Sequence, residues 1–251
     1  MDLKRRHEEL IMMMKEIHSI LDSNDIHYML IYGSALGAVR HKGIIPWDDD
    51  IDIGILREEL EKAEEFLSNQ LIYLFERSEK HLEPSAPIGH VRFINKEETD
   101  NIHGLKNYTT IDIWPIDKIP KDNKGIKKAR RNALVHDFSV YRKAPTNRGK
   151  LLYVFGKIAL FIMPNRILDM VQKRTYKKIV CFQYTDYYLT HNLFASKFNY
   201  FPKEVFYKRE YTSFEGMNLP IPQEYDKYLT GMYGDYMTPP PLDKRVTIHK
   251  S

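Results

Sequence analysis

Hydrophobic and polar positions in the first part of the chain alternate between the period of helices and the period of strands. Over residues 3–23 apolar side chains recur every three or four positions between charged ones, which predicts an amphipathic helix. Residues 27–33 (HYMLIYG) are almost all apolar or aromatic, which predicts a buried strand. Residues 50–55 (DIDIGI) alternate polar and apolar side chains, which predicts a half-buried strand.

The same reasoning extends the pattern as far as residue 117. Helices are expected at residues 35–40 and 57–70, and strands at residues 72–78, 90–95 and 109–117. We expect Pro115 to stop the last of these strands. The regular mixture of helices and strands predicts an α+β protein with an α/β-like core.

The pattern changes from about residue 124. Residues 123–143 are basic and are predicted to be helical. Residues 150–168 contain an apolar run of about fourteen residues, broken only by Gly156 and Lys157, and this run is too short to span a bilayer. It predicts either a buried helix of a helical subdomain or a helix lying in the plane of a membrane between basic residues.

Composition narrows the class of protein. The chain has 251 residues, of which 43% are hydrophobic, and this is enough for a sizeable core. A net charge of +4 suits a nucleotide, a small acidic substrate or an anionic membrane, and is too weak to indicate nucleic acid. The single cysteine, Cys181, excludes an intrachain disulfide and a cysteine zinc site. With no apolar signal stretch at residues 1–10, we expect a cytoplasmic protein.

Residues 33–55 (GSALGAVRHKGIIPWDDDIDIGI) concentrate the candidate chemistry. Asp50 and Asp52 are two positions apart on a predicted strand, so both point to one side with Cα atoms roughly 7 Å apart. Neighbouring carboxylates raise each other's pKa unless a cation lies between them, and Mg²⁺ is the usual cation where a phosphate completes the coordination. Asp48 is two positions before Asp50 and would point to the same side, but it adjoins a loop. We therefore expect it near the metal without binding it directly, or at the substrate.

The start of this segment predicts an anion site. A strand that ends at Gly33-Ser34 and leads into a short helix directs backbone N–H groups outward, toward a phosphate. Arg40, His41 and Lys42 follow and can contact further phosphate oxygens. An isolated Asp-x-Asp or Gly-Ser pair is most often part of a solvated loop. The order and spacing of the two pairs favour the functional interpretation.

That order resembles the signature of nucleotidyltransferase-fold enzymes. The resemblance implies a third carboxylate on a neighbouring strand, for which Asp112 in TTIDIWPID is the candidate. The alternative for Asp112 is a strand-edge aspartate bonded to backbone. Asp117, which follows Pro115, is expected in a turn or at a helix cap.

Three segments together resemble the LicD family of phosphotransferases, which includes fukutin and the fukutin-related protein. They are residues 33–55, Ile111–Asp117 (IDIWPID) and Phe214–Arg245, and they bracket nearly the whole chain, whereas residues 120–200 match no motif. The resemblance implies a mixed β-sheet core flanked by helices and transfer of a phospho-alcohol from a CDP-linked donor to a glycan. In bacteria the group is typically phosphocholine, carried to teichoic acid, lipopolysaccharide or capsule, and in the animal relatives it is ribitol phosphate.

By position, the resemblance implies that Gly33 and Ser34 hold phosphate and that Asp50, Asp52 and Asp112 hold Mg²⁺ or Mn²⁺. The residue pattern and the resemblance together suggest three parts of one compact unit: a nucleotidyltransferase-like core over residues 1–120, a helical, basic and apolar subdomain over 121–200, and a C-terminal segment over 201–251 that packs back on the active site.

Several further residues are weaker candidates. Three prolines, Pro239–Pro241, would hold Arg245 in place as a pyrophosphate clamp, although a surface arginine near a chain end is an equal alternative. The remaining candidates are His249 near the C-terminus, Arg92 and Lys96 as phosphate contacts, and Glu215, which is either structural or in contact with the acceptor.

The leading hypothesis is in-line attack of a sugar hydroxyl on the donor's β-phosphorus, with Asp112 orienting that hydroxyl or taking its proton. The expected partners are CDP-choline and a glycan or lipid-linked glycan, without nucleic acid. One alternative is transfer of NMP from an NTP, and another is a catalytically silent partner in glycan assembly.

Basic residues 124–150 beside apolar residues 151–163 suit peripheral contact with the inner face of the cell membrane. Choline would need an aromatic cage, whose members the sequence does not identify.

Overall fold

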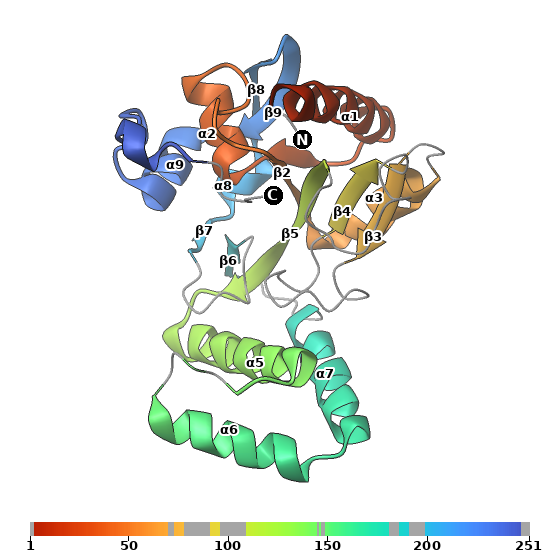
Figure 1. Ribbon diagram of the computed structural model, residues 1–251, viewed down its shortest axis with the longest axis vertical. Helices are drawn as coiled ribbons and strands as arrows, with labels where there is room; N and C mark the ends of the chain where they lie inside the picture. The colour runs from red at the N-terminus through yellow and green to blue at the C-terminus, as the bar shows by residue number, and fades with distance from the viewer. Residues whose placement is uncertain are drawn as a thin grey trace.

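A mixed β-sheet organises the protein, shown in Figure 1 as a computed structural model. The structure describes residues 3–69, 73–77, 91–95, 109–144, 146, 149–180, 186–190 and 199–246. Five strands lie in the order β1 (Tyr28–Leu30), β2 (Ile51–Leu56), β5 (Thr110–Pro120), β4 (Val91–Asn95) and β3 (Tyr73–Arg77). The far end of β5 pairs with β6 (Tyr187–Thr190), which pairs with β7 (Phe201–Pro202). Among these strands β2 and β5 run parallel and the other pairs antiparallel, which confirms the predicted α+β class.

Helices cover the sheet and join its strands. The predicted N-terminal helix is confirmed as α1 (Leu3–Ser23), which buries its apolar stripe. The other helices of this part are α2 (Tyr32–Arg40), the short 3-10 helix η1 (Arg57–Glu59) and α3 (Leu60–Ser68). Because α2 follows β1 directly and packs on β2, it covers the sheet beside the Asp-x-Asp strand.

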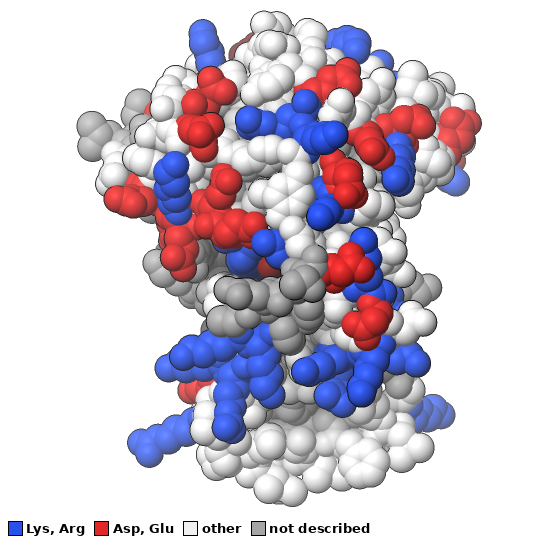
Figure 2. Space-filling model, turned by 180° about the vertical axis from the view of Figure 1, so that it is seen from behind, with Lys and Arg blue, Asp and Glu red and all other residues white. Residues whose placement is uncertain are grey.

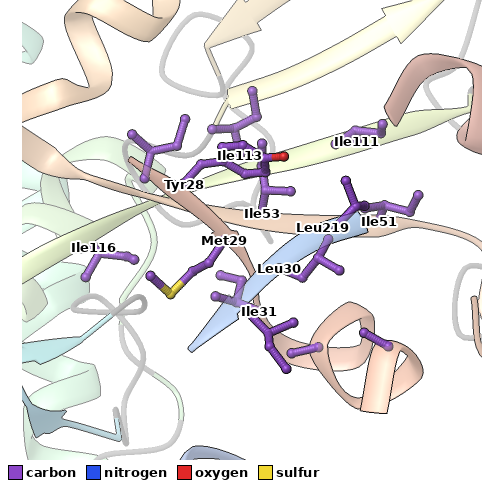
Figure 3. Close-up of a cluster of buried hydrophobic side chains, with 14 of the residues drawn as sticks. Tyr28, Met29, Leu30, Ile31, Ile51, Ile53, Ile111, Ile113, Ile116 and Leu219 are labelled. Carbon is purple, nitrogen blue, oxygen red and sulfur yellow. The ribbon is translucent and has the colours of Figure 1, made fainter. Parts of the chain in front are cut away.

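Strand β2 is buried along its whole length, so the expectation of a half-buried strand is wrong. It lies inside the sheet between β1 and β5. Figure 3 shows Ile51 and Ile53 of β2 in the same apolar cluster as Ile111 and Ile113 of β5 and Leu219. The alternate positions of β2 are also covered, because α2 packs against the strand. The one polar side chain of β2, that of Asp52, is therefore buried.

Two boundaries differ from the prediction. Strand β1 ends at Leu30 and α2 begins at Tyr32, so Gly33 and Ser34 lie in the first turn of the helix. Strand β5 continues through Pro115 as far as Pro120. Its pairing with β4 ends at Ile113 and its pairing with β6 begins at Asp117, so this edge is open at Pro115 and the missing N–H breaks no ladder hydrogen bond.

Asp117 lies within β5 and is buried, so its assignment to a turn or cap is wrong. Arg57 donates two hydrogen bonds to its carboxylate, from Nε at 2.7 Å and from Nη2 at 2.9 Å. This paired contact ties the end of β2, where η1 begins, to the neighbouring strand.

A three-helix lobe lies at the end of the molecule opposite α2 and α9 (Figure 1). It consists of α5 (Asn123–Tyr141), α6 (Lys150–Ile162) and α7 (Asn165–Val180). The predicted basic helix is confirmed as α5, which packs against α7 around a small apolar cluster. The expectation of a buried helix over residues 150–168 is wrong, because no residue of α6 is buried. Within the described part of the chain, no helix has the length and apolar character to cross a membrane.

The C-terminal segment returns to the core. The short helix α8 (Glu204–Tyr207) leads into a hairpin of β8 (Arg209–Phe214) and β9 (Met217–Pro222), which packs on β1 and α2. The sequence prediction missed this hairpin, although its turn, Glu215-Gly216, has the positive φ angles of a two-residue hairpin connection. Helix α9 (Tyr225–Tyr233) then packs on α2, and η3 (Leu242–Lys244) follows. Cys181, Lys96 and His249 lie outside the described residues.

Candidate active site

Three carboxylates meet where β2 and β5 run side by side. Asp52 and Asp112 are direct neighbours in the parallel register, and Asp50 precedes Asp52 by two positions. One carboxylate oxygen from each of the three lies within 4.8 Å of the others. The structure therefore brings together the three aspartates that the sequence singled out.

The electrostatics of this cluster favour a cation. Burial raises the pKa of Asp52 well above its usual range, and the charges of Asp50 and Asp112 raise it further. The indole Nε1 of Trp114 donates a 2.7 Å hydrogen bond to Asp52 Oδ1, which acts in the opposite direction. Three convergent carboxylate oxygens are the hard ligands that Mg²⁺ and Mn²⁺ take in proteins. The donor set thus fits a divalent cation.

Ser34 holds strand β2 in place. Its Oγ is buried and accepts a 2.8 Å hydrogen bond from the backbone N–H of Asp52. The hydroxyl thereby joins the first turn of α2 to β2. A contribution of Ser34 to phosphate binding would therefore come from its backbone.

Gly33 allows a close approach between α2 and the acidic loop, residues 48–50 (DDD) immediately before β2. A Cβ atom at this position would lie 2.7 Å from Asp48 Oδ2. Glycine therefore lets the Asp48 carboxylate lie against the start of the helix. Both residues line a cavity that is described below.

We expect Gly33→Ala to reduce turnover about tenfold or more with little change in melting temperature. The new methyl group would push the Asp48 carboxylate away, while alanine is favoured over glycine in a helix by about 1 kcal/mol, which offsets part of the strain. Turnover and thermal unfolding of the same preparation check this.

The contrasting variant is Gly37→Ala in the same helix. Its Cβ would overlap the backbone carbonyl of Gly43, which cannot turn aside as a side chain can, so we expect a stability loss of about 1–3 kcal/mol. Wild-type turnover in Gly33→Ala would contradict a role for Asp48 at the site.

Two members of the cluster, Asp50 and Asp52, face a cavity of about 550 Å³ between α2, the acidic loop and the C-terminal segment. Its acidic lining consists of Asp48, Asp50 and Asp52, with Asp235 from the C-terminal segment. Its aromatic lining consists of Tyr32, Trp47, Tyr233 and Tyr236, and its basic lining of Arg40 and Lys244. Residues almost 200 positions apart in the sequence therefore form one site. The aromatic side chains were not predicted from the sequence.

Basic groups gather at one side of this cavity. Arg40 Nη1 donates a 2.7 Å hydrogen bond to the carbonyl of Tyr236, and the Arg245 guanidinium lies 5.2 Å from the centre of the Trp47 ring. Burial and the charges of Arg40 and Arg245 lower the pKa of His41, which favours its neutral imidazole. The structure thus places Arg40, His41 and Arg245 near one another.

Other candidates are placed elsewhere. Lys42 is exposed and does not line the cavity. Arg92 faces Asp112 in the β4–β5 register, but its side chain lies outside what the structure describes. Glu215 Oε1 accepts a 2.9 Å hydrogen bond from the backbone N–H of Ile44, and its own N–H donates to the carbonyl of Lys42. These contacts support the structural alternative for Glu215.

The N-terminal helix α1 supports the acidic loop. These contacts were not predicted from the sequence. Arg6 Nη1 lies 2.7 Å from Asp49 Oδ2 in a buried ion pair. His7 Nε2 donates a 2.7 Å hydrogen bond to the carbonyl of Asp48. The sequence did contain an indication that Arg6 is buried. Arg6 is four residues before Leu10 and so lies on the buried stripe of α1.

These features define a nucleotidyltransferase-type enzyme site: a mixed sheet, a helix directly after its first strand, and an aspartate cluster at two parallel strands, with two of the three aspartates lining a cavity. Comparison with known proteins names the group more closely. The family described as "LicD/FKTN/FKRP, nucleotidyltransferase domain" matches residues 25–148. Lipopolysaccharide cholinephosphotransferase LicD of Haemophilus influenzae is 30% identical over 242 residues, 92% of this chain and 90% of that protein.

The chain therefore belongs to the LicD family and is a phosphotransferase. Shorter similarities agree with this placement. Ribitol 5-phosphate transferase FKRP of Homo sapiens and that of Mus musculus are each 46% identical over 46 residues, 18% of this chain and 9% of those proteins.

Proposed function

We propose that this protein transfers a phospho-alcohol, with phosphocholine as the first candidate, from a CDP-linked donor to a hydroxyl of a cell-surface glycan such as lipopolysaccharide. The observation that carries the proposal is the cluster of Asp50, Asp52 and Asp112 beside a cavity with both aromatic and basic lining. The relative aligned over most of the chain has the name of a lipopolysaccharide cholinephosphotransferase, which supports the choice of group and acceptor.

In this proposal Asp50, Asp52 and Asp112 hold Mg²⁺ or Mn²⁺. When bound there, the cation would neutralise negative charge on the donor pyrophosphate and on the departing CMP. Trp114 and Ser34 keep Asp52 in position through their hydrogen bonds. Asp112, on the neighbouring strand, orients the acceptor hydroxyl and takes its proton.

The donor pyrophosphate would lie between the start of α2 and the basic side chains. Gly33 lines the cavity at the N-terminal turn of this helix, where backbone N–H groups and the helix dipole favour an anion. Arg40, at the other end of α2, and Arg245, beside the Trp47 ring, supply positive charge, and each is held by a hydrogen bond to a backbone carbonyl. Such fixed donors position the reacting phosphorus for in-line attack.

The aromatic lining supports choline as the alcohol. A trimethylammonium group has no hydrogen-bond donors and binds to the faces of aromatic rings. Tyr32, Trp47, Tyr233 and Tyr236 provide such rings around one cavity. Ribitol or glycerol would instead need several polar partners for their hydroxyl groups.

The test is a thermal-shift panel with Mg²⁺ or Mn²⁺ and CDP-choline, CDP-ribitol, CDP-glycerol, CMP, CTP or ATP. We expect metal-dependent stabilisation that is largest with CDP-choline, because a ligand stabilises the native state in proportion to its occupancy and affinity. A Tyr233→Leu variant should lose the preference for CDP-choline over CMP and keep the response to CMP. A response to NTPs alone would favour nucleotidyl transfer, and no response to any CDP-alcohol would contradict the proposal.

A further inference from the structure

The three-helix lobe carries the opposite charge to the rest of the molecule. Residues 123–180 contain 15 lysines and arginines against two aspartates, a net charge of +13. The remaining residues contain 23 basic and 32 acidic side chains, a net charge of −9. Figure 2 shows basic residues as a band across the lobe and acidic residues gathered on the larger part. The overall charge of +4 conceals this separation.

Helix α6 presents an apolar face to solvent. Six of its exposed apolar residues recur at the spacing of one helical face: Leu151, Val154, Phe155, Ile158, Phe161 and Ile162. Phe161 is 92% exposed and Leu151 is 75% exposed. The patch continues through Met163 to Ile167 and Met170 of α7. A contiguous apolar surface of this kind marks an interaction site in a water-soluble domain.

Cations surround this apolar face. The exposed basic residues of α5 are Lys124, Lys127, Lys128, Arg130 and Arg131, and those of α7 are Arg166, Lys173, Arg174, Lys177 and Lys178. On α7, Arg166, Lys173, Arg174 and Lys177 also line a hollow of about 600 Å³. In Figure 2 the basic band lies beside the uncharged end of the lobe. The surface is therefore apolar at its tip and positive around it.

The charge decides which partner fits. A second copy of the chain on this face would bring two sets of cations together, and like charges across an interface cost free energy. A nucleic acid would match the cations and leave the apolar face of α6 in water. An anionic bilayer complements both features, because its headgroups match the cations and its acyl chains accept the apolar side chains.

We propose that residues 123–180 form a peripheral docking surface for anionic membranes. Helix α6 lies in the membrane plane with Phe155 and Phe161 inserted at the boundary of headgroups and acyl chains, and the basic residues of α5 and α7 contact phospholipid headgroups. The cavity lies beside α2 and α9, at the other end of the molecule (Figure 1). Docking would therefore leave the active site open to solvent and to a glycan that extends from the membrane.

The test is vesicle flotation of the full chain. Wild-type protein should float with vesicles of equal parts phosphatidylglycerol and phosphatidylcholine, much less with phosphatidylcholine alone, and less as salt screens the charges. Phe155→Asp with Phe161→Asp should lower partitioning about 100-fold or more. Lys173→Ala with Lys177→Ala should lower it roughly 25-fold, since each basic residue near the surface contributes about fivefold.

Matched controls come from α1 on the core. Met12→Asp changes another exposed apolar residue, and Lys15→Ala removes another exposed cation, and both should leave flotation unchanged. Circular dichroism melting checks that all variants are folded. Failure of the wild type to float, or equal flotation of the lobe and control variants, would overturn the proposal. So would a wild-type dimer that Phe161→Asp dissociates without any vesicle binding. Because flotation measures binding without turnover, its result is independent of the donor and acceptor proposed above.

Discussion

Asp52→Asn is expected to reduce turnover by about 10³-fold or more while leaving the fold intact. The substitution removes one anionic ligand of the proposed cation, whose stabilisation of developing charge is worth several kcal/mol. Asparagine keeps the shape of the side chain and an oxygen that can accept the hydrogen bond from Trp114. Steady-state turnover with CDP-choline and Mg²⁺ measures the effect.

The same substitution, Asp52→Asn, should not lower the stability of the metal-free protein, although it lowers turnover. Burial and the neighbouring carboxylates disfavour a charge on Asp52 and raise its pKa, so neutral asparagine removes an unfavourable charge from the folded state. We therefore expect metal-free Asp52→Asn to melt at or above the wild-type temperature, and its melting temperature to respond less to added Mg²⁺.

Asp235→Asn is the matched control, because Asp235 lines the same cavity but is outside the three-carboxylate cluster. It should keep turnover within about tenfold of the wild type. If both Asp50→Asn and Asp52→Asn also stay within tenfold, the assignment of these residues to a metal is wrong.

The second large effect is on stability, at Arg6. Its side chain is 8% exposed and that of Asp49 is 1% exposed, so Arg6→Ala would leave a buried carboxylate without its facing cation. Breaking a buried ion pair in this way typically costs about 3–5 kcal/mol. We expect the free energy of unfolding, measured by urea denaturation, to fall by that amount.

The neighbouring residue provides the control. Arg5 also makes an ion pair, with Glu9, but its side chain is 67% exposed. Arg5→Ala should cost less than about 1 kcal/mol, because the Arg5 side of the pair lies in water and the Glu9 carboxylate keeps the hydrogen bond from Thr109 Oγ1. The double variant Arg6→Met with Asp49→Leu should recover most of the lost stability, because it removes both buried charges. Equal effects of Arg5→Ala and Arg6→Ala would show that the buried pair does not support the acidic loop.

Much of the active site depends on short-range pattern and could be predicted from the sequence. The two-residue period of a strand fixes that Asp50 and Asp52 share a side, wherever that strand lies. The parallel neighbour that carries Asp112 followed from the resemblance to a family. Similarly, the 3.6-residue period of α1 identified its buried face, which the structure confirms.

Contacts between distant segments could not be predicted in this way. The pairing of Arg6 with Asp49 joins residues 43 positions apart, and Tyr236 meets Arg40 across 196 positions. Periodicity says which side chains share a face but not which element will cover that face. The aromatic lining of the cavity therefore became visible only when the C-terminal segment was seen against α2.

Helix α6 shows the same limit most clearly. Its apolar residues recur as they would in a buried helix, so the pattern alone favoured a buried helix over the alternative of a membrane-surface helix. Packing of α5 on α7 satisfies the small core of the lobe, and α6 is left with its apolar face in solvent. The sequence by itself determined most of the helices and strands of the N-terminal half and the aspartate pair. The tertiary structure decided which faces are covered, because burial depends on what segments far along the chain bring to the same place.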